Sequence, residues 1–415
     1  MADGVQIEGL IAAERLAALD ATGPVELLVG VPTLNHARSV ARVVENVVAG
    51  LAKQAPAPKA VVLVADAGSR DGTLESIRSW RETARSDPAV HDVRLMGPPN
   101  RGRAILAILT VAQRLRAHAC GLVDADLISV TPVWIGQLLL PVIRGEADFV
   151  SPVYSRTVSE GTLTTNLLAP MTQALYGRRL QHPLGGCVGL SEDLVGRYLQ
   201  ADIWTSELAA HGVDLWLATE ALVSGARVME THLGRKIVEP PPGQPDLATT
   251  VARVVGPLFR LMEKYHEAWE DIRGSVGVPL IGHPAAFLGE PGEPQGERMV
   301  RAFRLGLKDL LPVWEQIMPE ETLARLYPLG LLAVDEFRFP VPTWARVVSD
   351  FALAYHARRL PRDHLLRALT PLYLGRVAAF LLEARGTPPS RFPQMMEAIG
   401  QAFEVEREFL RARWR

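Results

Sequence analysis

Short apolar segments alternate with helical segments along the first third of the chain, and this alternation constrains the fold more than any other feature. Residues 25–31 and 60–65 are apolar and rich in β-branched side chains, which is typical of buried strands. Residues 38–51 repeat apolar side chains at helical spacing, and residues 72–81 predict a second helix. Strand, loop, helix and strand in this order predict right-handed βαβ units and a parallel sheet.

Polar side chains follow the predicted strands of this sheet. Residues 93–96 and 121–123 predict two further strands, with a helix over 104–117 between them. Asn35 and Asp66 come directly after the first and second strands, and the acids at 124 and 126 come after the fourth. Ligands of open α/β sheets bind at the carboxyl ends of the strands, so we expect a binding site there.

The second half of the chain predicts mostly helices. The stretch 274–296 repeats Pro and Gly, which interrupts regular structure and predicts a linker. It separates an α/β catalytic domain over 1–273 from a helical domain over 297–415, in which residues 341–357 and 364–385 predict long helices.

The composition indicates a globular protein and excludes several kinds of partner. Of the 415 residues, 48% are hydrophobic and 22% are charged, and the net charge is −2. A net charge this close to zero gives no long-range positive electrostatic field that would attract nucleic acid or an anionic membrane surface. The two cysteines, Cys120 and Cys187, have no CxxC partner, so neither a disulfide framework nor a thiolate metal site is expected. Without a basic leader or an apolar run of ~18 residues, we expect a cytoplasmic protein and no membrane partner.

Asp124-Ala125-Asp126 is the strongest single motif for chemistry. Two carboxylates one residue apart in a loop can share a divalent cation and the diphosphate bound to it, and oxygen ligands suit Mg or Mn. The alternative is an ordinary turn, in which the aspartates accept hydrogen bonds from nearby amides. The motif alone does not decide between the two.

A second polar loop favours a nucleotide site. Asp66 could accept hydrogen bonds from a nucleobase imide or a ribose hydroxyl, and Gly68 permits close approach of the backbone. Asp71 is expected to cap the following helix in either case.

These segments together resemble a known superfamily. Residues 32–35 (PTLN), 66–73 (DAGSRDGT) and 124–126 (DAD) resemble, in order and spacing, the nucleotide-binding blocks of GT-A glycosyltransferases. The resemblance implies an α/β, Rossmann-like GT-A domain that binds a nucleotide sugar, followed by a mostly helical C-terminal domain. It also implies hexosyltransferase activity.

Later segments resemble one group within that superfamily. Residues 183–186 (PLGG), 211–214 (HGVD) and 369–377 are similar to segments of the retaining mannosylglycerate, glucosylglycerate and glucosyl-3-phosphoglycerate synthases. This resemblance implies transfer of glucose or mannose from a UDP- or GDP-hexose, with retention of configuration. The implied acceptor is a small hydroxy acid such as D-glycerate or 3-phosphoglycerate, and the implied assembly is a homodimer.

The resemblance also implies roles for individual residues. Those implied to contact the nucleotide sugar are Pro32, Thr33, Asn35, Asp66, Gly68, Arg101, Asp124 and Ala125. Those implied to bind the acceptor are Arg156, Thr164, Leu184, Gly185 and Gly186. Those implied to take part in catalysis are Asp124, Asp126, Asp214 and Leu184, and the implied ligands of Mg or Mn are Asp126 and His232.

Three positions depart from the family pattern. His36 replaces an acid, and Arg101 replaces a lysine and keeps its charge. Val238 stands where relatives have a metal-ligand histidine, and valine cannot coordinate a cation. His232 is the nearest imidazole. Alternatively Arg235 and Lys236 neutralise the diphosphate, so the metal requirement is expected to be weak.

Three other functions are possible for a sequence with these motifs. A nucleotidyltransferase should carry a Gly-rich and basic first loop, which residues 30–33 lack. A processive membrane synthase should carry spanning helices. A catalytically inactive protein that senses sugar nucleotides is the most serious alternative, because of Val238. No GxSxG, HExxH or P-loop motif occurs, which argues against those hydrolase and nucleotide-hydrolysing mechanisms.

Overall fold

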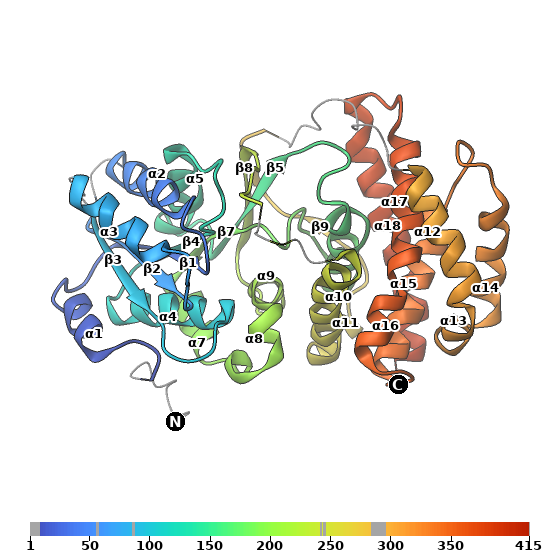
Figure 1. Cartoon of the computed structure of the whole chain (residues 1–415), viewed down its shortest axis with the longest axis horizontal. Coiled ribbons are helices and arrows are strands. Elements are labelled where there is room, and N and C mark those ends of the chain that lie inside the picture. Colours follow the sequence, from blue (N-terminus) through green and yellow to red (C-terminus); the bar gives the residue numbers. More distant parts are fainter. Residues whose placement is uncertain are drawn as a thin grey trace. The chain divides into compact units, whose positions relative to one another are not determined.

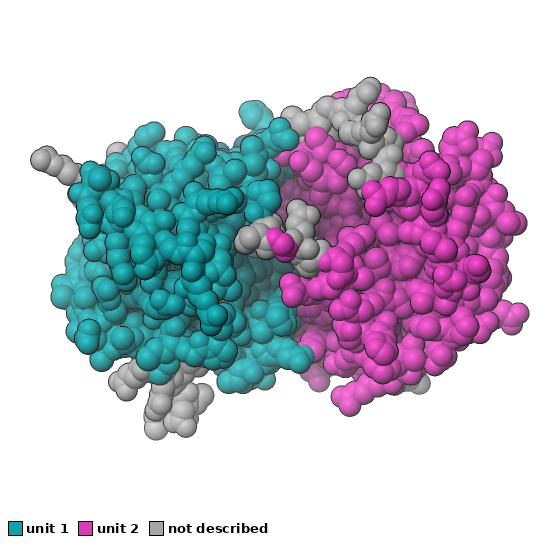
Figure 2. Space-filling model, viewed as in Figure 1, with its two compact units in different colours: residues 1–154, 184–242, 279–284 teal, residues 155–183, 243–278, 285–415 magenta. Residues whose placement is uncertain are grey.

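The computed structural model divides into two compact units (Figures 1 and 2). It describes residues 9–54, 58–84, 88–240, 243, 246–283 and 296–414. Unit 1 comprises residues 1–154, 184–242 and 279–284, and unit 2 comprises residues 155–183, 243–278 and 285–415. Part of the predicted linker, residues 284–295, lies outside the described residues.

Unit 1 is built on a sheet in the strand order β10-β8-β5-β7-β4-β1-β2-β3. The strands are β1 Leu27–Thr33, β2 Ala60–Asp66, β3 Ala89–Arg94, β4 Ala119–Val123, β5 Phe149–Ser155, β7 Cys187–Ser191, β8 Val228–Arg235 and β10 Leu280–Ile281. β1 pairs in parallel with β2 and β4, and β2 pairs in parallel with β3, which confirms the predicted βαβ order. β7 lies antiparallel between β4 and β5, so the whole sheet is mixed, and the predicted N-terminal strands form its parallel part.

Helices cover both faces of this sheet. α2 (Val40–Ala52) and α5 (Pro132–Ile143) share one apolar core with Val29 and Val31 of β1. α4 (Arg101–Arg114) packs on the opposite face, where a Cβ added at Gly30 would lie 2.2 Å from Cγ2 of Ile108. The other helices of unit 1 are α1 Ala13–Asp20, α3 Thr73–Thr83, α7 Glu192–Leu199, η3 Asp202–Thr205, α8 Glu207–His211 and α9 Val213–Val223.

The predicted apolar stripe of α2 is confirmed. Val40, Val43, Val44, Val47 and Leu51 are all buried. Each buried aliphatic side chain of this size stabilises the fold by roughly 1.5–3 kcal/mol relative to exposure. The stripe therefore fixes α2 against the sheet and so places the β1–α2 loop at the carboxyl end of β1.

Unit 2 is mostly helical. Its elements are η2 Thr164–Leu168, α6 Ala169–Tyr176, α10 Leu247–Lys264, α11 His266–Glu270, α12 Gly296–Asp309, α13 Leu311–Ile317, α14 Glu320–Leu326, η4 Tyr327–Leu331, α15 Val341–His356, α16 Arg362–Ala368, α17 Thr370–Ala384, η5 Pro389–Arg391 and α18 Phe392–Arg413, with β6 Arg178–Arg179 paired to β9 Val276–Gly277. α6 packs on α18 and α10 packs on α16.

Segments 155–183 and 243–278 thus belong with the C-terminal helices. The division at 1–273, 274–296 and 297–415 stays a prediction, and the compact units divide the chain differently.

One apolar stretch of unit 2 has the length and composition of a membrane span. It covers Arg362–Ala384, and 78% of its most apolar 18 residues are buried inside the protein. The stretch forms two helices, α16 and α17, because Pro371 stands at the start of the second. The prediction of a single helix over 364–385 is therefore wrong, because the stretch is divided between two helices.

Candidate functional site

The loops after β1 and β2 are tied together by side chains that the sequence singled out. Asn35 has the positive φ of 60° that favours Asn in such a turn. Its backbone N–H donates to Oγ of Ser69 at 2.8 Å, and its Oδ1 accepts from the backbone N–H of Arg70 at 2.9 Å. Both loops therefore form one rigid edge at the carboxyl ends of these strands.

Asp66 at the end of β2 is fully buried and faces its own loop. Its two carboxylate oxygens each lie 3.1 Å from the backbone N–H of Ser69, and Oδ1 also accepts from the Ser69 hydroxyl. Gly68 between them has a φ of 107°, which a side chain would strain. The contact of Asp66 and Gly68 with a nucleoside stays a prediction.

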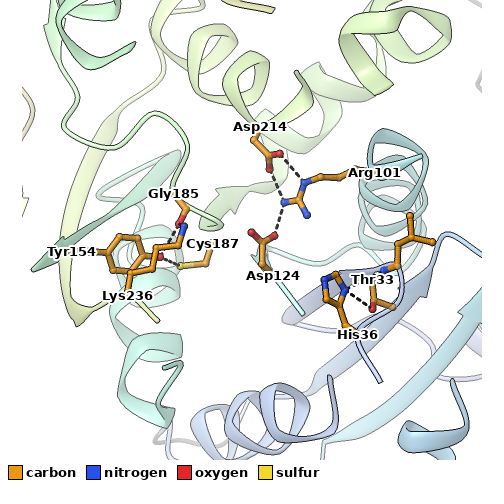
Figure 3. Close-up of polar contacts among 10 residues, drawn as sticks. Thr33, His36, Arg101, Asp124, Tyr154, Gly185, Cys187, Asp214 and Lys236 are labelled. Atoms are coloured by element: carbon orange, nitrogen blue, oxygen red, sulfur yellow. Dashed lines mark hydrogen bonds and ion pairs between the residues drawn. The ribbon is translucent and has the colours of Figure 1, made fainter. Parts of the chain in front are cut away.

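Pro32 and Thr33 close β1 and are buried. Oγ1 of Thr33 lies 3.3 Å from Nδ1 of His36, the residue that replaces an acid of the family pattern (Figure 3). The carboxylate of Asp71 accepts from the backbone N–H groups of Thr73 and Ala37, although the N-cap residue of α3 is Gly72. Partial burial acts to raise the pKa of Asp71, but these hydrogen bonds lower it overall.

Three charged side chains from distant parts of unit 1 meet at the carboxyl end of β4 (Figure 3). Arg101, the first residue of α4, donates from Nε to Oδ2 of Asp214 and from Nη2 to its Oδ1, both at 2.7 Å. Nη2 of Arg101 also donates to Oδ1 of Asp124 at 2.5 Å. Asp124 directly follows β4, and Asp214 lies in the first turn of α9. We call these three residues the Arg101 cluster.

The Arg101 cluster is largely shielded from water. The side chains of Arg101, Asp124 and Asp214 are 33%, 20% and 31% exposed. Burial raises the pKa of Asp124 to about 6, with Arg101 opposing the shift and the carboxylates of Asp214 and Asp126 adding to it. Burial also acts on Asp214, but the charge and the hydrogen bonds of Arg101 outweigh it and lower its pKa. The guanidinium is thus shared between two carboxylates.

The loop that precedes β7 lies against this cluster. The carbonyl oxygen of Gly185 accepts from Oη of Tyr154 at 2.9 Å and from Nζ of Lys236 at 3.0 Å (Figure 3). The backbone N–H of Asp124 donates to the carbonyl of Gly186 at 2.9 Å. Gly186 has a φ of 80°, which would strain any residue with a side chain, and a Cβ there would lie 2.7 Å from Oδ2 of Asp124.

From the sequence, Tyr154 had no predicted role, and for Cys187 only a disulfide framework and a thiolate metal site were excluded. Oη of Tyr154 lies 3.0 Å from Sγ of Cys187, and both residues are buried. Burial raises the pKa of Cys187 to about 12 and raises that of Tyr154 well above its ordinary value. Neither residue belongs to a sequence motif that would have indicated a place in the site. Leu184, the implied catalytic backbone residue of this loop, is half-buried.

The implied metal ligands do not assemble into a three-ligand site. Within the described ranges, no three His, Cys, Asp or Glu residues come together as metal ligands would. His232 lies on β8, where burial and the neighbouring His283 lower its pKa, and Val238 is 41% exposed. A Mg ion bound through one or two carboxylates and substrate phosphates needs fewer protein ligands. Asp126, with Asp124 beside it, fits that second kind of site.

The implied acceptor residues outside this loop belong to unit 2. Arg156 follows β5, and burial lowers its pKa to about 10, with Glu160 opposing the shift. Thr164 begins the π-helical turn η2. The structure brings Asp124, Asp214, Gly185 and Gly186 together in unit 1, whereas the acceptor roles of Arg156 and Thr164 stay predictions. Ala125 is buried between Asp124 and Asp126.

Comparison with known proteins relates the stretch that carries these loops to a family. Residues 28–191 match the family described as Glycosyl transferase family 2, and this stretch contains the predicted alternation of strands and helices from β1 to β5. No curated protein matches the chain. Solved structures that it resembles include glucosyl-3-phosphoglycerate synthase from Mycobacterium tuberculosis with Mg²⁺ and UDP (19% identity, 60% of this chain and 82% of that chain covered, TM-score 0.43). The same enzyme with Mn²⁺, UDP-glucose and phosphoglyceric acid matches with 19% identity, the same coverage and a TM-score of 0.42.

Proposed function

We propose that the stretch that matches glycosyl transferase family 2 makes the chain a retaining hexosyltransferase. It would move glucose or mannose from a UDP- or GDP-hexose to a small hydroxy acid such as D-glycerate or 3-phosphoglycerate. The observation that carries the proposal is the Arg101 cluster, which gathers Asp124 and Asp214 at the carboxyl end of β4. Ligands of α/β sheets bind at such strand ends, and the motifs that resemble donor-binding blocks supply these acids.

The proposed reaction needs no side-chain nucleophile. The hydroxyl oxygen of the acceptor forms a bond to the anomeric carbon while the bond from that carbon to the diphosphate oxygen breaks. The hydroxyl proton passes to the departing diphosphate, which leaves as UDP or GDP. Asp214 would accept hydrogen bonds from the sugar hydroxyls, and the backbone of residues 184–186 would border the anomeric carbon.

A divalent cation is part of this proposal. Asp126 would hold Mg or Mn together with the diphosphate oxygens, since Mg is commonly bound by one or two carboxylates and substrate phosphates. Such a cation supplies positive charge to the leaving group. His232 stays an implied second ligand of this cation, and the described residues hold no group of three or more His, Cys, Asp or Glu side chains placed for a metal.

One observation favours the alternative of an inactive sugar-nucleotide sensor. Val238 occupies the position of a family ligand, and the described residues offer no three-ligand metal group in its place. A sensor would bind the nucleotide sugar without transferring or hydrolysing it.

Product mass decides between the two functions. The protein is incubated with a panel of UDP- and GDP-hexoses, D-glycerate or 3-phosphoglycerate, and Mg or Mn. The proposed enzyme adds one hexose to one acid, and NMR of the product shows the anomeric configuration of the donor. Tight nucleotide binding with neither transfer nor hydrolysis would favour the sensor, and an inverted product would refute retention.

A further inference from the structure

We infer that helix α17 positions the acceptor-binding segment of the proposed transferase, and that Tyr373 is its positioning residue. The inference rests on the proposed function, because it assumes that Arg156 and Thr164 bind the acceptor acid. Both residues lie on the segment 156–168, which belongs to unit 2 together with α17. The C-terminal helices thereby take part in acceptor binding through this segment.

A hydrogen bond between two side chains joins α17 to the middle of the segment. Oγ1 of Thr162 lies 2.5 Å from Oη of Tyr373, although the two residues are 211 positions apart in the chain. Tyr373 is buried and Thr162 is half-buried. Two residues after Thr162, Thr164 begins the π-helical turn η2. Phenylalanine keeps the ring of Tyr373 and lacks only the hydroxyl, so this contact can be removed while the packing of the ring stays.

The buried end of the segment is held by two helices. Asn166 is fully buried, and its Oδ1 accepts from Nε of Arg376 on α17 at 3.1 Å. Its backbone carbonyl accepts from Nε1 of Trp344 on α15 at 2.6 Å, and its Nδ2 donates to the carbonyl of Thr162 at 3.1 Å. A buried polar group that loses its partner is costly, so these bonds fix Asn166 in place. Thr164 lies between the two residues that α17 holds.

Arg376 is a rigid support for these contacts. Its side chain is fully buried, and Nη1 and Nη2 each donate to one carboxylate oxygen of Glu383 at 2.8 Å. Nη1 also donates to the carbonyl of Phe339 at 2.7 Å. A bidentate guanidinium–carboxylate pair has a specific geometry, which limits how far Arg376 can move. Arg376 and Tyr373 are three positions apart, so one side of α17 carries both contacts to the segment.

The other predicted acceptor residue depends on the same segment. The guanidinium of Arg156 lies beside Gly161, where an added Cβ would clash with Nη1. Gly161 has a φ of 64°, and its carbonyl accepts from the backbone N–H of Thr165 at 3.0 Å, in the turn that leads into η2. A displacement of this turn therefore moves Arg156 and Thr164 together. Tyr373 acts on acceptor binding through both of them.

Steady-state kinetics test the inference, with a saturating UDP- or GDP-hexose and whichever of D-glycerate and 3-phosphoglycerate wild type accepts. The variants are Tyr373→Phe, Thr162→Val and the two combined, and the matched control is Tyr355→Phe. Tyr355 is also a buried tyrosine of unit 2, and its hydroxyl accepts from Nε of Arg260 at 3.2 Å.

We expect Tyr373→Phe to raise the KM for the acceptor by about threefold to tenfold, as for the loss of one buried hydrogen bond, and to leave the KM for the donor unchanged. Thr162→Val should also raise the KM for the acceptor, and the double variant should be no worse than Thr162→Val. Tyr355→Phe should keep both KM values of wild type.

Hydrogen exchange read by mass spectrometry tests the positioning without any substrate. The amides of residues 162–168 should exchange faster in Tyr373→Phe than in wild type, and at the wild-type rate in Tyr355→Phe. An unchanged KM for the acceptor in Tyr373→Phe would overturn the inference. An equal rise in Tyr355→Phe would overturn it as well, because any hydrogen bond lost from unit 2 would then have the same effect. If wild type adds a hexose to neither acid, the proposed function itself fails, whereas an active wild type with unchanged variants refutes only the inference.

Discussion

The ion pair between Arg101 and Asp214 gives the sharpest prediction about how the site holds together. Its two hydrogen bonds at 2.7 Å join α4 to α9, which are 113 positions apart at these residues. We consider Arg101→Met, Asp214→Asn and the double variant. The first removes the guanidinium, and the second keeps the shape of the side chain but removes its charge.

The coupling energy follows from geometry and burial. A hydrogen bond to a charged group contributes a net ~1.5–3 kcal/mol when buried, and an exposed ion pair contributes ~0–1 kcal/mol. The side chains of Arg101 and Asp214 are 33% and 31% exposed, which lies between these cases. We therefore expect a coupling of roughly 1–2 kcal/mol for the pair, with Arg101→Met the more destabilising single variant because it leaves two carboxylates unpaired.

Urea unfolding of wild type, the two single variants and the double variant measures this coupling as a double-mutant cycle. The matched control is the pair of Arg114 and Asp20, which is also bidentate, at 2.5 and 2.6 Å, but is 45% and 40% exposed. Its cycle should give a smaller coupling, because both side chains are more exposed to water. A value for Arg101 and Asp214 no larger than that of the control would refute the reasoning that shielding from water gives the cluster its strength.

Three further predictions concern activity and pH. Asp126→Ala should abolish transfer while the circular dichroism spectrum stays unchanged, and near-normal turnover would contradict its role at the cation. Arg156→Ala should raise the KM for the acceptor far more than the KM for the donor, and the reverse would place the acceptor elsewhere. In unit 2, burial raises the pKa of Asp350 from 3.8 to about 6, against the hydrogen bond from Thr322, so the folded protein keeps a proton that the unfolded chain releases. The free energy of unfolding should therefore fall by up to about 3 kcal/mol as the pH rises from about 4 to 6. Asp350→Asn should remove that fall. If urea titrations give wild type and Asp350→Asn the same dependence of the free energy of unfolding on pH, the raised pKa of Asp350 is contradicted.

The sequence predicted the first half of the sheet well because its strands are locally distinctive. The strand expected over 60–65 is β2, Ala60–Asp66, and the one expected over 121–123 lies within β4. β7 was missed because it is short and contains Gly189, where a Cβ would lie 2.2 Å from the carbonyl oxygen of Leu138. Close packing on α5 requires glycine there, and glycine weakens the apolar pattern that identifies a strand.

β8 was missed for a different physical reason. It buries Glu230 and Thr231, so its inward side chains are partly polar and the sequence does not alternate between apolar and polar residues. Its tertiary context, rather than its propensity, makes it a strand. Since Lys236 directly follows β8, missing this strand also concealed the surroundings of Lys236.

The site shows the same division between local and long-range information. Asn35, Asp66 and the DAD motif follow strands that the pattern predicts, so their common edge could be expected from the sequence. The partners of Arg101 could not, because Asp124 and Asp214 are 23 and 113 positions away and meet it only in the folded unit. Local motifs therefore predicted which residues matter, but not which of them neutralise one another.

The contact between Arg101 and Asp124 bears on whether the DAD motif can still meet a ligand. Only Oδ1 of Asp124 bonds to Arg101, and Oδ2 points to the volume beside Gly186 and Nζ of Lys236. Among the described residues, the side chain of Asp126 takes no part in the cluster. One oxygen of Asp124 and the carboxylate of Asp126 thus remain for a ribose hydroxyl or a cation. Because Arg101 already partners the other oxygen, donor binding would not need to break the cluster, and the ion pairs would persist through the reaction as a fixed frame for the donor.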